Sequence, residues 1–507
     1  MKLRKVVGLD LGSSNSSISH WTPRGPEVIN VDGQPLLPSV VTIVPADAVG
    51  PDESQIFVGL DGIEAGKRYR DYCFRLFKRR LGEMWHADED TGHQTVGAAD
   101  GSLHYQGPDD HTYSPVELCS MVISKLLDAA QTKFKGERPD GAVICVPATF
   151  TPSQRKAVEE AGLMAGLAYV ELMDEPTAAA LAYGYDFKRV RRIAVLDVGG
   201  GTTDVSIIQT GAGLVTVLGT GGSSITGGSD VDAILGRYIV NQWATEHEGS
   251  DIAVDDSAMT LVLGEAEETK KRLSRKQRTE FRIKDFDRTP GGVVLHMDYV
   301  INRQILEHLA VDLLKRMRSA CEIAISEAQR KDPNFSVRDL NDVVLVGGGT
   351  RMPAVQSLAA QVFGQEAKTD IDPEIAVVLG AAIRAAVVAG IKSDLQIQDI
   401  LAFSVAIEVY DKVEGVASVI IPRGQNYPTD KPISFALTNR EPGQSVLPVR
   451  LVTGDHDRAS ACELLYAIDV EVYPQDARMH RIPLTISING RGEPYGECGG
   501  VAFGSSD

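Results

Sequence analysis

Several signatures that would assign a chain to a narrow class are missing from these 507 residues. No Cys-x-x-Cys pair occurs and the cysteines are far apart, so we expect neither a zinc site nor a disulfide framework. No apolar run is long enough to span a membrane, and residues 1–5 lead into the first strand without the apolar stretch of a signal peptide. We therefore expect a location in the reducing cytoplasm. The six cysteines are Cys73, Cys119, Cys145, Cys321, Cys462 and Cys498.

Positive charge is also scarce. The 51 lysines and arginines are outnumbered by 69 aspartates and glutamates, which leaves a net charge of −18, and no long basic run occurs. This balance argues against nonspecific binding to DNA, RNA or an anionic membrane. The hydrophobic content of 43% is ordinary for a globular protein, and the length predicts about two to four domains.

The most informative feature that is present is a motif found twice, far apart in the chain. Residues 6–18 read VVGLDLGSSNSSI, and residues 194–207 read AVLDVGGGTTDVSI. In each copy an apolar strand ends at an aspartate, Asp10 or Asp197, and a run of very small residues follows. Each copy predicts a strand, a tight turn and a second strand.

Small residues at such a turn suit a polyphosphate, because backbone N–H groups can approach it closely. Two carboxylates beside phosphates suit a hydrated Mg²⁺ ion. We therefore interpret the repeat as two similar lobes that hold one nucleotide between them, with Asp10 and Asp197 facing each other across a cleft. The alternative is a pair of unrelated glycine-rich hairpins.

The texture of the sequence changes near residue 391. Residues 1–390 alternate strand and helix patterns, which predicts an α/β architecture of two lobes. Residues 391–400 are the expected linker, and residues 401–507 carry short β-type runs that predict an all-β sandwich. The expected helices are residues 115–134, 152–162 (ended by Gly162), 261–278, 300–329 and 376–389. The expected C-terminal strands are residues 404–409, 416–421, 433–437, 446–452, 464–470 and 484–488.

Five motifs follow one another along the chain: GLDLGSSN (8–15), VPATF (146–150), DEPTAAA (174–180), DVGGGTTD (197–204) and LVGGGTRMP (345–353). Together they resemble those of the DnaK-type heat-shock chaperones, which share the actin and sugar-kinase nucleotide fold. The similarity covers residues 5–390 closely and 391–490 loosely. It implies an ATPase that controls the binding of extended, unfolded polypeptides, with a J-domain co-chaperone and a nucleotide-exchange factor as partners.

The resemblance also implies roles for charged residues. Asp10 and Asp197 would hold Mg²⁺ mostly through water, Asp197 would also orient the attacking water, and Asp204 would lie near a bound K⁺ ion. Glu175 would orient water and metal, and Lys78 would contact the γ-phosphate and stabilise the transferring phosphoryl group. From the residues alone, these acids could instead be strand-end and helix-start acids, and Lys78 part of a solvated basic patch.

Further residues would surround the ATP molecule. Glu267, Lys270 and Ser274 share one helical face and match adenosine-contacting positions, although such a face could equally be solvated. Arg351 would flank the adenine, and Thr202 would offer its hydroxyl to the phosphates. The remaining implied cofactor-binding residues are Gly12, Ser13, Ser14, Asn15, Gly199, Gly200, Gly201, Thr203, Gly227, Gly228, Gly347, Gly348 and Gly349.

Three departures from the family pattern stand out. Asp174 occupies a position where the family usually has asparagine, which adds a charge near the site. Pro147 and Arg155 match an interlobe relay of the family, although Pro147 could equally be a plain strand-end proline. The linker reads DLQIQD (394–399), with glutamines at two usually apolar positions, so linker docking by apolar burial would be weakened. Residues 491–496 are polar and rich in proline and glycine, so we expect a trimmed sandwich, and no helix-forming run follows for a lid.

Other functions fit less well. A regulatory or scaffold ATPase with one dedicated partner is the main alternative, and the glutamine linker favours it. A small-molecule kinase would need a sugar-site motif, and none is evident. A filament-forming protein would have no use for the C-terminal β region. For a peptide-binding protein, the candidate groove residues in that region are 403–407 and 417–421.

Overall fold

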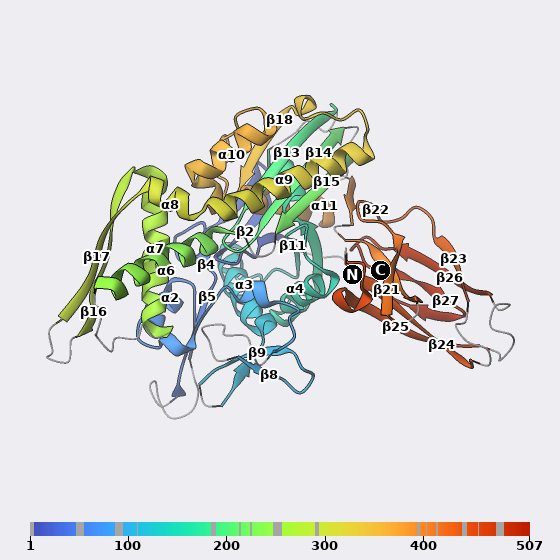
Figure 1. Cartoon of the computed structure of the whole chain (residues 1–507), viewed down its shortest axis with the longest axis horizontal. Helices are drawn as coiled ribbons and strands as arrows, with labels where there is room; N and C mark the ends of the chain where they lie inside the picture. Colours follow the sequence, from blue (N-terminus) through green and yellow to red (C-terminus); the bar gives the residue numbers. More distant parts are fainter. Residues whose placement is uncertain are drawn as a thin grey trace.

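The structure is a computed structural model that describes residues 5–46, 55–86, 95–108, 110–183, 189–211, 214–223, 226–246, 256–288, 294–392, 396–401, 403–411, 414–438, 444–454, 456–472 and 481–506. Figure 1 shows two α/β halves, with a region of strands beside them that contains the C-terminus. None of the helices in the described ranges combines the length and the apolar character that a bilayer span requires.

The first half is built on a sheet with strand order β12-β11-β1-β2-β3, in which β4 also pairs with β2. Strands β12, β11 and β1 run parallel, whereas β1, β2 and β3 form antiparallel hairpins. The main sheet comprises β1 (Val6–Asp10), β2 (Asn15–Thr22), β3 (Gly25–Ile29), β4 (Leu37–Pro38), β11 (Gly141–Val146) and β12 (Tyr169–Asp174). Around it lie β5 (Val40–Val44), β6 (Gln55–Val58), α2 (Leu60–Gly66), η1 (Arg70–Tyr72), β7 (Cys73–Arg75), η2 (Phe77–Arg80), β8 (Thr95–Gly97), β9 (Leu103–Gln106), β10 (Thr112–Tyr113), α3 (Pro115–Lys133) and α4 (Pro152–Met164).

The second half repeats this plan. Its sheet has the order β18-β13-β14-β15-β19-β22, in which β18 and β13 run parallel and β13, β14 and β15 form antiparallel hairpins. The predicted duplication of strand, turn and strand is therefore confirmed. The sheet comprises β13 (Arg191–Val198), β14 (Thr203–Gly211), β15 (Leu214–Ser223), β18 (Asp342–Val346), β19 (Gln396–Ile400) and β22 (Asn426–Tyr427). The other elements are α6 (Gly228–Glu246), α7 (Asp256–Arg275), β16 (Arg278–Arg288), β17 (Val294–Asn302), α8 (Arg303–Leu309), α9 (Val311–Lys331), η3 (Val337–Asp339), η4 (Gly348–Arg351) and α10 (Pro353–Phe363).

Two helices of small residues, α5 (Glu175–Ala182) and α11 (Ala376–Val388), pack together between the halves. They approach so closely that a Cβ atom at Gly380 would lie 1.8 Å from the carbonyl oxygen of Ala178. Their buried residues form one hydrophobic cluster with side chains from both main sheets, including Val143 and Val195. This shared cluster fixes how the two sheets face each other.

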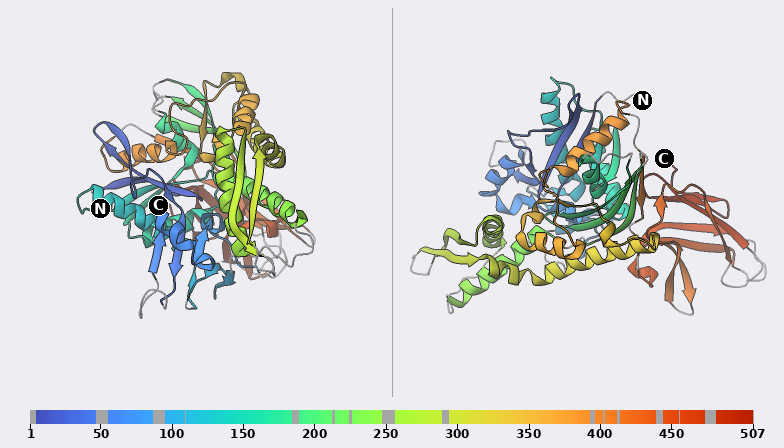
Figure 2. Two further views of the ribbon diagram at one scale, coloured as in Figure 1. Left: turned by 90° about the vertical axis from the view of Figure 1, so that its left-hand side faces the viewer. Right: turned by 90° about the horizontal axis from the view of Figure 1, so that it is seen from above.

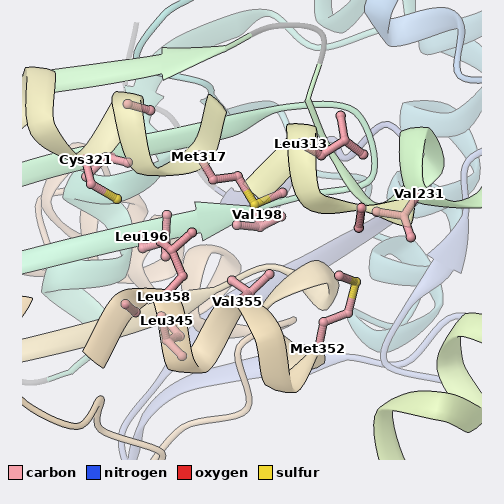
Figure 3. Close-up of a cluster of buried hydrophobic side chains, with 14 of the residues drawn as sticks. Leu196, Val198, Val231, Leu313, Met317, Cys321, Leu345, Met352, Val355 and Leu358 are labelled. Carbon is pink, nitrogen blue, oxygen red and sulfur yellow. The ribbon is translucent and has the colours of Figure 1, made fainter. Parts of the chain in front are cut away.

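Side-chain alternation along β13 decides where its aspartate points. Figure 3 shows Leu196 and Val198 packed among Met317 of α9 and Val355 of α10, in the core of the second half. Successive side chains on a strand point to opposite faces, so Asp197 lies on the other face, toward the first half. Strand β1 follows the same rule, because Val7 and Leu9 enter the core of the first half and Asp10 faces away from it.

The C-terminal strands form two four-stranded sheets, β21-β20-β24-β25 and β23-β26-β27-β28, which contribute to a single hydrophobic cluster. All six predicted β runs are strands. The expectation of a trimmed end was wrong, because β27 pairs with β26 and β28 pairs with β27. The elements are β20 (Val405–Asp411), β21 (Glu414–Ile421), β23 (Ile433–Thr438), β24 (Val446–Thr453), η5 (Ala459–Ala461), β25 (Glu463–Glu471), β26 (Arg481–Ile488), β27 (Pro494–Cys498) and β28 (Val501–Phe503).

Three helix predictions need correction. Helix α4 continues through Gly162 to Met164, because Gly162 serves close packing, with its Cβ position 2.8 Å from a methyl of Val170, and not termination. The helix predicted over 261–278 runs from Asp256 to Arg275. The helix predicted over 300–329 begins only after β17, which runs directly into it, and it is divided at Ala310 into α8 and α9.

The expected linker contains a strand that joins the second half to the C-terminal region. Strand β19 pairs in parallel with β15 on one side and antiparallel with β22 on the other. Figure 2 shows α9 running from the β16–β17 hairpin toward the C-terminal strands. At that end, the Lys331 ammonium donates hydrogen bonds to the carbonyl oxygen of Val217 on β15 and to the side chain of Asn426 on β22.

Candidate active site

The two small-residue turns meet between the halves. The turn after β1 is tight, since a Cβ atom at Gly12 would lie 2.0 Å from the carbonyl oxygen of Asn15. A Cβ atom at Gly200, in the other turn, would lie 2.0 Å from the hydroxyl oxygen of Ser14. The two turns therefore lie against each other.

Two further glycine segments converge on the second turn. Gly347 has a φ of 79°, and a Cβ atom there would lie 2.6 Å from Oδ1 of Asp197. A Cβ atom at Gly227 would lie 2.6 Å from the carbonyl oxygen of Gly200, and the N–H of Gly228 donates to Gly199 at 2.9 Å. The structure thus brings the sequence-predicted glycines of 199–201, 227–228 and 347–349 together. At Gly227, Gly347 and Gly349 neighbouring backbone lies so close that a side chain has no room.

A buried ion pair joins Lys78 and Glu175. Lys78 lies on η2, Glu175 is the first residue of α5, and the Lys78 ammonium donates to Glu175 Oε1 at 3.1 Å. Their side chains are only 5% and 9% exposed. Burial lowers the pKa of Lys78, but Glu175 and Asp10 more than compensate and raise it above its ordinary value. Lys78 therefore remains a cation, so the predicted solvated patch does not describe it.

Asp204 is a buried carboxylate with hydrogen-bond donors at only one of its two oxygens among the described residues. Oδ1 of Asp204 accepts hydrogen bonds from the hydroxyl of Thr149 at 2.8 Å and from its N–H at 3.3 Å. Oδ2 of Asp204 is buried and has no hydrogen-bond partner among the described residues. Such a group is costly unless a cation or water satisfies it. Thr149 lies in the VPATF motif, but sequence reasoning did not identify it as a donor.

The carboxylates together create a strongly negative field. Burial, followed by the charge of Glu175, raises the pKa of Asp10 to about 7, and the same two causes raise that of Asp204 to about 7. Burial and the neighbouring acids also raise the pKa of Asp197 well above its ordinary value. Lys78 alone does not balance Asp10, Glu175, Asp197 and Asp204. Carboxylate oxygens suit a hard cation such as Mg²⁺, and among the described residues no three acidic, histidine or cysteine side chains are placed to hold one directly, so these acids fit an ion that keeps its water shell.

The helical face predicted to contact adenosine has its own ion pair. Lys270 on α7 donates to Asp232 of α6 at 2.7 Å and to the carbonyl oxygen of Gly228 at 2.8 Å, so it lies beside the glycine segments. Burial raises the pKa of Asp232 to about 6. Glu267 pairs with Lys271 at 2.8 Å, and the Ser274 hydroxyl donates to the carbonyl of Lys270. Sequence reasoning missed Asp232, whose only signal is an acid on the buried face of an amphipathic helix.

Arg351 lies at the end of η4, close to the glycine segment 347–349. Its guanidinium donates to Asp372 at 2.6 Å and to Glu374 at 3.0 Å. These contacts hold the guanidinium in place, and the side chain is 41% exposed. Thr202 and Thr203 are held in the second turn by hydrogen bonds. The N–H of Gly199 donates to the carbonyl oxygen of Thr202, and the hydroxyl of Thr203 donates to the carbonyl oxygen of Thr226.

The model of the family described as Hsp70 protein matches residues 6–493. The chain belongs to the Hsp70 family. The match spans both halves and most of the C-terminal strands, and it confirms the resemblance drawn from the five motifs. Hsp70 proteins are ATP-dependent chaperones that bind ATP with Mg²⁺, hydrolyse it, and bind unfolded polypeptides and co-chaperones.

Proposed function

We propose that this Hsp70 protein hydrolyses ATP slowly to ADP and phosphate, and that the bound nucleotide controls how tightly it binds extended, unfolded polypeptide segments. The observation that carries the proposal is the buried Lys78–Glu175 pair together with three buried carboxylates. Their raised pKa values reflect a concentration of negative charge that bound cations would balance, and the three are Asp10, Asp197 and Asp204. Phosphoryl transfer depends mainly on positioning and on electrostatic stabilisation, and this arrangement is suited to both.

Each side chain has a role in this proposal. Lys78 stabilises negative charge on the transferring phosphoryl group, while Glu175 and Asp197 accept hydrogen bonds from the attacking water and so orient it. Asp10 and Asp197 would hold a hydrated Mg²⁺, and Asp204, with its buried orphan oxygen, would hold a monovalent cation such as K⁺. When bound, Mg²⁺ supplies neutralisation of phosphate charge. The N–H groups of the two turns cradle the phosphates.

The structure supports a physical route from this site to a polypeptide-binding region. We propose residues 1–390 as the nucleotide-binding unit, 391–400 as the linker and 401–507 as a β-sandwich that binds polypeptide. Strand β21, which contains the candidate groove residues 417–421, is an edge strand, and Val419 on it is 54% exposed. An extended peptide can add to such an edge. The other candidate segment, 403–407, includes Phe403, which lines the junction with α4.

The proposal extends to partners and location. A J-domain co-chaperone and a nucleotide-exchange factor are expected partners, and the separated cysteines suit a cytoplasmic protein. Among the described residues all six are free thiols, five of them buried.

One combined experiment tests the function. The ATPase rate is measured with and without an extended apolar peptide, together with tryptic cleavage near residues 391–399. Faster turnover with peptide and ATP-dependent protection of the linker are expected. A chain that binds neither ATP nor peptide would overturn the proposal.

A regulatory or scaffold ATPase with a single dedicated partner is the second candidate. The two glutamines of the linker, Gln396 and Gln398, favour it, because weak coupling would suffice for such a protein. Competition separates the candidates. Unrelated apolar peptides should displace a polypeptide that is bound to a general chaperone, whereas they should not displace a dedicated partner from a scaffold ATPase.

A further inference from the structure

Lys331 is the last residue of α9, the helix that reaches the C-terminal strands (Figure 2). Its ammonium donates to the carbonyl oxygen of Val217 on β15 at 3.0 Å and to the side chain of Asn426 on β22. The pairing of β15 with the linker strand β19 ends at Thr216, one residue before Val217, and β19 pairs with β22 from Asp399 onward. The ammonium therefore bridges the two neighbours of β19 at the point where one ladder ends and the other begins.

A cavity of about 390 Å³ lies beside this ammonium. Lys331 lines the cavity together with residues of the segment 424–430, which include Asn426, Thr429 and Asp430. The volume is within the range that small-molecule sites occupy in proteins. Lys331 is exposed as a residue, so a small molecule that enters the cavity has access to its side chain.

The acids next to Lys331 on α9 are paired with other cations. Glu327 pairs with Arg423 at 2.5 Å. Asp332 pairs with Arg192 at 2.6 Å. Among the described residues the Lys331 ammonium forms no ion pair, and its two hydrogen-bond partners are uncharged. Burial lowers the pKa of Lys331 to about 8, so near neutral pH it contains far more of the neutral, nucleophilic amine than an ordinary lysine. The charged groups around it are Glu327, Arg330, Asp332, Arg423 and Asp430.

We propose that Lys331 is a modification site that takes an acyl group from a small acyl phosphate, and that its acylation loosens the linker strand β19. The neutral amine attacks the carbonyl carbon and forms a C–N bond. The bond from that carbon to the phosphate oxygen breaks, phosphate leaves, and the amine gives up a proton to water. The product is an uncharged amide with one N–H in place of the three donors of the ammonium, so it cannot serve both Val217 and Asn426.

The modification is tested on the full chain with acetyl phosphate as the probe, at about pH 7.5, and peptide mass spectrometry follows the acetylation of each lysine with time. Lys331 is expected to react about tenfold faster than Lys315, because the gain in neutral amine outweighs the loss of intrinsic nucleophilicity. Lys315 is the matched control, since it lies on the same helix and is 72% exposed. A rate at Lys331 that is equal to or lower than the rate at Lys315 overturns the proposal.

Hydrogen exchange of the backbone amides in residues 396–400 tests the consequence for the linker. After acetylation of the parent chain, these amides should exchange about fivefold faster or more. Lys331→Arg keeps the charge but takes no acyl group, so the treated variant carries the same acetylation at every other lysine and should keep the slow exchange. Lys331→Gln should exchange fast without the probe. Equal exchange in the treated parent and treated Lys331→Arg overturns the effect on the linker. Neither measurement requires bound nucleotide, so both are independent of the proposed function.

Discussion

The guanidinium of Arg155 lies 2.6 Å from the carboxylate of Asp174, the residue that directly precedes Glu175. Asp174 is the N-cap of α5, yet its side chain makes no capping hydrogen bond and turns to Arg155 instead. The two side chains are 12% and 5% exposed. The aspartate that departs from the family's usual asparagine thus has a buried cationic partner, and that partner fixes the backbone from which Glu175 projects.

Helix α4, which carries Arg155, also contacts the C-terminal strands. The N–H of Ser153 donates to Glu463 on β25 at 3.2 Å, and Arg491 pairs with Glu159 at 2.9 Å. Arg155 itself lines a pocket shared with residues of the C-terminal region, including Phe403. One helix therefore touches the C-terminal strands on one side and the acids of the candidate site on the other.

The first prediction concerns Asp174. Asp174→Asn keeps an oxygen for Arg155 but removes the charge, so the free energy of unfolding should fall by about 1 kcal/mol. Asp174→Leu removes the acceptor and leaves the arginine charge buried, and it should cost about 3 kcal/mol or more. Urea unfolding measures both. Asp128→Asn, at an exposed ion pair, should change little, and equal losses at the two positions would contradict the argument.

The local parts of the site could be predicted from sequence. Small residues after Asp10 and Asp197 determine the turns, and strand alternation determines which face each aspartate occupies. Both signals lie within a dozen residues, so no knowledge of the tertiary fold was needed. The C-terminal strands were also predictable, because alternating apolar residues between turn formers are a local pattern.

The pairings across the site could not be predicted in this way. Asp230 and Asp232 look like ordinary acids at the start of a helix, and only the fold brings Arg79 and Lys270 to them. The β16–β17 hairpin was missed because β16 is rich in charge and β17 runs directly into a helix. The prediction that the linker docks weakly rested on its glutamine side chains. Its strand is instead held by backbone pairing on both sides, and such pairing is largely independent of side-chain type.

A second prediction tests Lys78. Lys78→Met removes the only buried ammonium that touches Glu175 among the described residues, so phosphoryl charge loses its stabilisation. Single-turnover ATP hydrolysis should fall by about 10²- to 10³-fold, while ATP binding is largely retained. Lys67→Met is the matched control, because Lys67 lies in the same half and is 65% exposed. Unchanged hydrolysis in Lys78→Met would remove Lys78 from the mechanism.

The third prediction concerns the strand in the linker. Ile397→Pro removes a backbone N–H and introduces a ring into β19, which is flanked by strands on both sides. Proline in such a strand disrupts the ladder, so the linker should separate from β15. Trypsin should then cleave after Lys392 faster in the presence of ATP, and peptide should no longer stimulate the ATPase. Gln398→Ala keeps the N–H and serves as the control. Equal protection of both variants would show that backbone pairing does not hold the linker.

The last prediction is a pH dependence at the junction of α9 and the C-terminal strands. Burial lowers the pKa of Lys331 to about 8, and Glu327 offsets this only in part. The unfolded chain, with an ordinary lysine pKa of 10.5, binds more protons than the folded chain between about pH 8 and that value. The contribution of Lys331 to stability should therefore increase as pH rises through this window.

Thermal unfolding of the parent chain and of Lys331→Met, measured from pH 7.5 to pH 10 on matched samples, isolates this contribution, since other groups titrate alike in both. The difference between the two melting temperatures should shift in favour of the parent as pH rises. Lys331 is exposed as a residue, but its ammonium is partly desolvated where it donates to Val217. The neutral amine still donates there, so deprotonation relieves the cost of the partly desolvated charge without loss of that contact. Lys315→Met, on the same helix and 72% exposed, should show no such trend. A difference that is constant with pH would mean that Lys331 is fully solvated at this junction.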